Sequence, residues 1–227
     1  MTMATALPRK VHRAFFVAAL AGAIVISSLL ASGAESETDR LVDLLHLTST
    51  SAVADVGAGS GAFSVMMAER LGPKATVYST EIDPKLLDKI RSAARKADVY
   101  NLIVIAGAKD DTHLPANCCD AIFLRRVYHH ITDPTAMDHS LFRALRPGGR
   151  LAIIDFEPWQ KPKEKAPPGV PADRGGHGSP KPIVVKELTQ AGFEWISTTE
   201  WPVSGDVTHF CMLFRKPSAT AAAAISP

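Results

Sequence analysis

Short apolar runs alternate with stretches of helical periodicity along most of this chain. Five apolar runs are predicted to form strands, at residues 53–57, 76–82, 102–107, 120–126 and 150–157. Helices are predicted between them, at residues 63–71, 84–97 and 134–145. The last two follow Asp83-Pro84 and Asp133-Pro134, in which aspartate caps a helix and proline occupies its first position. Nearly continuous apolar strands separated by helices are typical of a parallel sheet covered on both faces, so we predict an α/β fold.

The pattern changes after residue 157. Residues 158–182 are rich in proline and contain a glycine-rich patch, RGGHG, at 174–178. A loop of this length in a compact domain usually has a function. We expect a mobile lid that carries His177 to a pocket, the alternative being an ordinary solvated loop. A helix over about 183–192 follows, and residues 194–201 and 208–216 are predicted to pair as a hairpin at the sheet edge.

The first 34 residues have the layout of a secretory signal peptide. Arg9, Lys10 and Arg13 precede an apolar run over residues 14–31, which small and then acidic residues follow. The run is also long enough for a membrane anchor. A buried amphipathic helix and a mitochondrial presequence are the alternatives. We therefore divide the chain into a leader (1–34), a folded body (35–217) and a disordered tail (218–227).

The charge of the chain follows this division. The formal net charge is +2, but the leader holds three basic residues and no acidic one, so the rest has 22 basic and 23 acidic residues. A nearly neutral body does not favour nucleic acid as a partner. With 46% hydrophobic and 21% charged residues, the chain does not have the composition of a disordered protein. Its three cysteines do not form a closed set of disulfide pairs.

A glycine-rich loop, DVGAGSGAFS at 55–64, joins the first strand to the first helix. Such a loop lets a ligand approach the backbone, and the helix that follows offers free N–H groups. Glu81 ends the second strand, where a carboxylate can accept both hydroxyls of a ribose. These two features fit NAD as well as another nucleoside cofactor. Asp55 favours a cationic sulfonium or amino-acid ligand over a pyrophosphate, and Asp110 lies after the third strand, where it could meet an adenine amine.

Together with the turn Leu145-Arg-Pro-Gly-Gly149, these residues resemble the class I S-adenosylmethionine (SAM)-dependent methyltransferases. The resemblance covers about residues 38–216 and is greatest to the small-molecule group similar to ubiquinone and menaquinone biosynthesis enzymes. It implies a Rossmann-like three-layer sandwich, with a seven-stranded, mostly parallel sheet whose last strand is antiparallel. It also implies SAM as the cofactor, held at the following residues: Asp55, Gly57, Ala58, Gly59, Gly61, Glu81, Ile82, Asp110 and Arg125. The family often has Gly-Asp after the third strand, whereas this chain has Gly107-Ala108, which leaves the adenine contact open between Asp110, Asp111 and backbone groups.

Polar side chains after the fourth and fifth strands are candidates for handling the acceptor. Tyr128, His129 and His130 follow the fourth strand, and Asp155 ends the fifth, at the edge where open α/β sheets bind ligands. An imidazole or phenol could take a proton from the acceptor, and Asp155 could bind a hydroxyl or fix a histidine tautomer. The alternative is a structural role for each. No metal-binding motif spacing occurs, so we expect no metal.

The sequence therefore predicts an enzyme that moves a methyl group from SAM to a small molecule. Two alternatives remain: an NAD(P)-linked Rossmann oxidoreductase, and a membrane-tethered SAM-binding protein without activity. The leader indicates an exported or membrane-anchored protein, on the periplasmic side in a bacterium. A cytoplasmic location is the alternative, because SAM is made in the cytosol.

Overall fold

The computed structural model describes residues 36–158, 166–202 and 208–218. The leader, with its apolar run at 14–31, lies outside the described residues, as does nearly all of the predicted tail. None of the described helices has both the length and the hydropathy needed to cross a membrane. From Glu37 onward the described residues belong to one compact unit.

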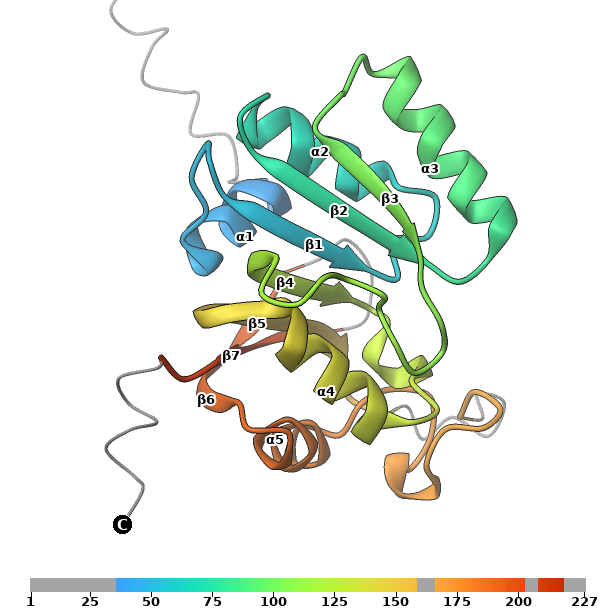
Figure 1. The fold of residues 1–227 in the computed structure, drawn as a ribbon. Coiled ribbons are helices and arrows are strands. Elements are labelled where there is room, and N and C mark those ends of the chain that lie inside the picture. The colour runs from blue at the N-terminus through green and yellow to red at the C-terminus, as the bar shows by residue number, and fades with distance from the viewer. Residues whose placement is uncertain (1–35, 159–165, 203–207, 219–227) are drawn as a thin grey trace, which may run out of the picture. The chain divides into compact units, whose positions relative to one another are not determined.

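Seven strands form one sheet in this unit (Figure 1). They are β1 (Ala52–Val56), β2 (Thr76–Glu81), β3 (Leu102–Ala106), β4 (Cys119–Arg125), β5 (Leu145–Phe156), β6 (Glu194–Trp201) and β7 (His209–Arg215). Their order is β3-β2-β1-β4-β5-β7-β6. The neighbouring pairs from β3 to β5 are parallel, whereas β7 runs antiparallel to both β5 and β6. The predicted fold class and the edge hairpin are confirmed.

Five α-helices and two short 3-10 helices accompany the sheet. The α-helices are α1 (Glu37–Leu45), α2 (Ala62–Leu71), α3 (Pro84–Lys96), α4 (Pro134–Ala144) and α5 (Lys181–Gln190), and the 3-10 helices are η1 (Tyr128–His130) and η2 (Ala172–Arg174). Helices α1 and α2 pack on one face of the sheet, and α4 and α5 pack on the other. In β1, Val53 belongs to the core that includes α1 and α2, and Ala54 belongs to the core that includes α4 and α5. Both faces of this central strand are therefore buried.

Both Asp-Pro pairs begin helices as predicted. The side chain of Asp83 accepts a hydrogen bond from the backbone N–H of Lys85 at the start of α3. Asp133 caps α4 in the same way through the N–H of Ala136. These caps satisfy N–H groups that have no partner within the first turn of a helix.

The structure differs from the sequence prediction at two elements. Strand β5 begins at Leu145, not at residue 150, because Gly148 N–H donates to Lys216 O and Lys216 N–H donates to Gly149 O. The expected turn at 147–149 is thus held against the segment that follows β7. The sequence reading also missed α1, a nine-residue helix that buries Leu41, Val42 and Leu45 against α2 and the sheet.

Candidate functional site

A cavity of about 460 Å³ opens at the carboxyl ends of the parallel strands. Val56 and Gly57 line it after β1, Glu81 and Ile82 after β2, and His130 after β4. The chain builds β2 and β3 to one side of β1, then β4 and β5 to the other side. Open α/β sheets bind ligands at this change of direction, and the volume is in the usual range for small-molecule sites.

The glycine loop begins at the wall of this cavity, which Gly57 lines. Gly57, Gly59 and Gly61 all have positive φ angles, of 74°, 58° and 81°. A Cβ on Gly57 would lie 2.7 Å from both methyl carbons of Val127, and one on Gly61 would lie 2.9 Å from Ile90 side-chain carbons. The N–H groups of Gly57 and Ala58 both donate to Thr80 O at 3.0 Å. The loop therefore has a fixed backbone course that side chains at positions 57 and 61 would disturb.

Asp55 lies in β1 directly before this loop. Its carboxylate is buried and accepts a 2.6 Å hydrogen bond from Ser64 Oγ, which is 2.9 Å from Ser79 Oγ. Burial raises the pKa of Asp55 to about 6, although the Ser64 hydrogen bond and the charge of Arg125 act in the opposite direction. Asp55 therefore carries its negative charge only above about pH 6.

Glu81, the last residue of β2, binds the backbone of the glycine loop. Its Oε2 accepts from the Gly59 N–H at 2.8 Å, and its Oε1 accepts from the Ile82 N–H at 2.7 Å. These bonds hold the carboxylate at the end of β2, where it lines the cavity. Ile82 is half-exposed and lines the cavity beside it. The structure thus brings Glu81, Ile82 and the glycine loop together, as the sequence predicted.

Two other cofactor candidates lie elsewhere. Asp110 is exposed and does not line the cavity, whereas Asp111 does. The Asp111 carboxylate is bound by Ser140 Oγ and Arg143 at 2.9 Å each. Arg125 forms a bidentate ion pair with Glu37, at 2.8 and 2.9 Å, and so joins β4 to α1. The structure therefore gives Arg125 a partner away from the cavity.

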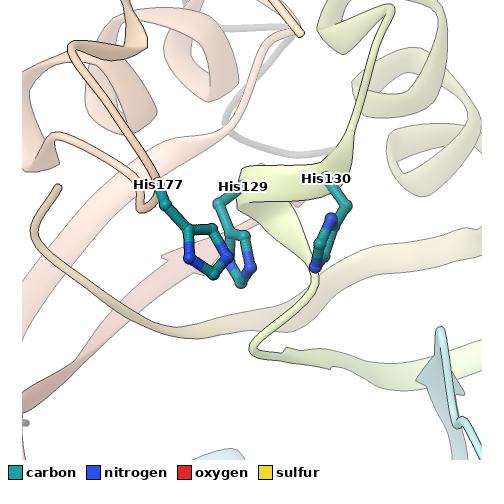
Figure 2. Close-up of side chains that lie close together, drawn as sticks. All are labelled: His129, His130 and His177. Carbon is teal, nitrogen blue, oxygen red and sulfur yellow. The ribbon is translucent and has the colours of Figure 1, made fainter. Parts of the chain in front are cut away.

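Three histidines converge after β4 (Figure 2). His129 is buried, and its Nδ1 lies 2.8 Å from Asp155 Oδ1, at the end of β5. Asp155 Oδ2 also accepts hydrogen bonds from the His129 N–H and from Ser179 Oγ. The rings of His130 and His177 have centroids 4.1 and 4.7 Å from that of His129, and 5.9 Å from each other. Burial and the two neighbouring imidazoles lower the pKa of His130.

Tyr128, the remaining acceptor-side candidate, is fully buried and does not line the cavity. Its hydroxyl oxygen lies 2.9 Å from both Asp138 Oδ2 and Glu187 Oε2 and shares its proton between them. Burial, followed by the charges of Asp138 and Glu187, raises its pKa well above the ordinary value. These contacts favour a structural role for Tyr128 over a part in handling the acceptor.

Sequence reasoning missed the rest of this buried cluster. Arg174, from η2, is fully buried, donates to Glu187 Oε2 at 2.9 Å and lies over the Tyr128 ring. Among the described residues, Arg174 Nε and Nη1 and Asp138 Oδ1 have no hydrogen-bond partner. The cluster fixes the segment before His177 against α4 and α5. Only the position of Arg174 in the glycine-rich patch could have drawn attention to it.

Protonation of Asp138 is expected to make folding depend on pH. Burial raises its pKa to about 7, so between about pH 4 and 7 the folded chain keeps a proton that the unfolded chain releases. The free energy of unfolding should therefore decrease as the pH rises through this range, by a few kcal/mol from this group. Asp138→Asn should make this slope smaller in urea unfolding followed from pH 4 to 8, and Asp55, whose pKa is also raised, should keep the remainder. The exposed Asp88→Asn variant is the control, and equal slopes in Asp138→Asn and wild type would contradict the prediction.

Comparison with known proteins agrees with this geometry. Residues 54–153 match the model of a protein family described as a methyltransferase domain. A demethylmenaquinone methyltransferase from Listeria welshimeri is 30% identical over 112 residues, 49% of this chain and 48% of that protein. A 27-O-demethylrifamycin SV methyltransferase from Amycolatopsis mediterranei is 32% identical over 120 residues, 52% of this chain and 43% of that protein. The chain spans about half the length of the curated relatives it matches.

Solved structures share the fold. A SAM-dependent methyltransferase from Aquifex aeolicus superposes with a TM-score of 0.65 at 22% identity, over 79% of this chain and 89% of that chain. The [4+2]-cyclase SpnF has the same TM-score at 15% identity, over 80% of this chain and 81% of that chain. Residues 54–153 are thus similar to a methyltransferase domain, and the strand order and superposition show the fold of the solved SAM-dependent methyltransferase. The resemblance stated from the sequence is confirmed, while the cyclase shows that this fold alone does not determine a reaction.

Proposed function

We propose that this chain is a SAM-dependent methyltransferase that acts on a small molecule. The observation that carries the proposal is the cavity at the change in strand direction, with the glycine loop on one wall and the Glu81 carboxylate beside it. Because Gly57 and Gly61 have no Cβ, the loop backbone lies close to Val127 and Ile90. A side chain at either position would collide with these residues. These residues fit a nucleoside cofactor whose ribose and amino-acid part meet at the loop.

Glu81, Ile82 and Asp55 each have a part in this proposal. Glu81 would accept hydrogen bonds from the ribose hydroxyls, and Ile82 would pack against the base. Asp55, ionised above about pH 6, would attract the positive amino-acid end. Its buried position favours a cation over a pyrophosphate, which supports SAM over NAD. When bound, SAM supplies a methyl group on a sulfonium that is already activated for transfer.

The acceptor side of the cavity is apolar except for a few polar groups. Val127, Ile131 and Met137 line it together with His130. Such a wall fits a small apolar acceptor that carries a polar reacting group. The names of the two relatives, which specify demethylmenaquinone and 27-O-demethylrifamycin SV, support a small-molecule acceptor. We infer that the protein's task is to align the acceptor with the methyl group, and that the polar atom of the acceptor lies near His130.

Binding of SAM to the purified chain tests the proposal. We expect calorimetry to show binding of SAM and S-adenosylhomocysteine, and Glu81→Ala to weaken both about 10- to 100-fold, because a charged hydrogen bond is lost. Glu69→Ala, at an exposed position of α2, is the matched control and should bind as wild type does. Failure of wild type to bind either ligand, or tighter binding of NAD, would overturn the proposal. Binding without turnover on a broad acceptor panel would support the inactive alternative.

A further inference from the structure

The three histidines converge in a way that no sequence motif indicates. His129 and His130 are in η1, whereas His177 comes from the loop after η2, about 50 residues along the chain. One ligand nitrogen from each lies within 4.8 Å of the other two. Figure 2 shows the rings of His129, His130 and His177 close together, and the rings of His130 and His177 are also within 5.9 Å of each other. Three imidazole nitrogens that converge in this way could share one ligand.

The surroundings of His129 are those of a metal ligand. Its Nδ1 is bound to Asp155 Oδ1, which leaves Nε2 for another partner. Asp155 is itself fixed by Ser179 Oγ and by the N–H groups of His129 and Phe156. Metal-binding histidines commonly donate their second ring N–H to such a carboxylate, which orients the ring and increases its basicity. Asp155 also supplies a buried negative charge beside the three neutral ligands.

We propose that His129, His130 and His177 bind one divalent transition-metal ion, with Zn²⁺ as the best fit. Three imidazole ligands with a fourth, open position are a common arrangement for catalytic zinc. Bonds of about 2.0–2.1 Å in a tetrahedral site would separate the nitrogens by about 3.3 Å. Small rotations of His130 and of the loop that carries His177 would bring the nitrogens from their present separation to this distance. Calcium and magnesium prefer oxygen ligands and do not fit.

The position of the site suggests which acceptors it would take. His130 lines the cavity, so the ion would lie at the cavity wall on the acceptor side. An ion with an open position binds and polarises an oxygen atom. We therefore extend the proposed function, on which this step rests, to acceptors with a hydroxyl or enol oxygen. The histidines would then be metal ligands and not general bases.

Metal titration of tag-free, chelator-treated full-length protein tests the site. We expect one Zn²⁺ per chain by competition with a chromophoric chelator, and a Co²⁺ absorption spectrum typical of nitrogen ligands. His130→Ala and His177→Ala should each weaken binding by about 10-fold or more, and Asp155→Asn by about 10- to 100-fold. His139→Ala, at an exposed position of α4, should bind metal as wild type does. Circular dichroism of each variant separates loss of ligands from loss of fold.

The results also separate this proposal from the proposed function. Absence of stoichiometric metal, or wild-type affinity in both His130→Ala and His177→Ala, would overturn the site even if SAM binds. Metal binding without SAM binding would support the site and overturn the methyltransferase proposal. A shift of the Co²⁺ spectrum on addition of acetohydroxamate, a small oxygen ligand, would support the open position, and an unchanged spectrum would contradict it.

Discussion

Arg174→Met is expected to lower the free energy of unfolding by about 3–5 kcal/mol, because it removes one partner of a buried ion pair. Arg174 is fully buried, and its guanidinium is the positive charge beside the carboxylates of Glu187 and Asp138 and the ring of Tyr128. Methionine has a similar length but leaves Glu187 without its cation. Urea unfolding measures the loss, and the midpoint of thermal unfolding should decrease by roughly 10 °C.

Two further variants make this result specific. Arg95→Met, at an exposed position near the end of α3, should change the stability by less than about 0.5 kcal/mol. Arg174→Met combined with Glu187→Leu should recover part of the loss, because both charges are then absent. If Arg174→Met were as stable as the Arg95 control, the buried pair would not hold η2 in place.

Gly57→Ala is expected to weaken SAM binding about 100-fold, because the alanine would strain the backbone and displace the side chain of Val127. The φ angle of Gly57 is +74°, and the new Cβ would lie 2.7 Å from both methyl carbons of Val127. Because Val127 lines the cavity, either the loop or this side chain must move into ligand space. Calorimetry with SAM measures the effect directly.

The control for this variant is another glycine with a positive φ angle. Gly72 has a φ angle of +83° at the end of α2, and a Cβ there would meet no atom within 4 Å. Gly72→Ala should therefore lower stability by about 1 kcal/mol and leave SAM affinity unchanged. Adding Val127→Ala to Gly57→Ala should restore part of the affinity. Unchanged affinity in Gly57→Ala would show that the loop does not contact the cofactor.

The sequence predicted those parts of the fold that depend on neighbouring residues. The caps at Asp83 and Asp133 use backbone groups two or three positions away, so the pattern alone identifies them. Strands β1 and β4 are largely buried on both faces, which makes them visible as apolar runs. The extension of β5 was missed because it depends on Lys216, a residue about 70 positions further along the chain.

The difference between contacts of neighbouring residues and contacts of residues far apart in the chain also applies to the site. Glu81 and the glycine loop are separated by one strand and one helix, and their relation is a fixed feature of this type of unit. The resemblance places Arg125, the last residue of β4, at the cofactor, but its partner Glu37 lies in a helix that the sequence did not reveal. The contacts of Arg174 and His177 depend on the course of a long proline-rich loop, for which local rules predict no path.

The reversed direction of β7 determines where the polypeptide leaves the domain. His209 pairs with Phe156 at the edge of the sheet that carries the cavity, and Arg215 pairs with Arg150 at the opposite edge. Residue 216 therefore emerges on the side away from the glycine loop and the histidines. A fluorophore or surface tether attached there would leave the mouth of the cavity open, which makes this position suitable for immobilising the protein in binding experiments.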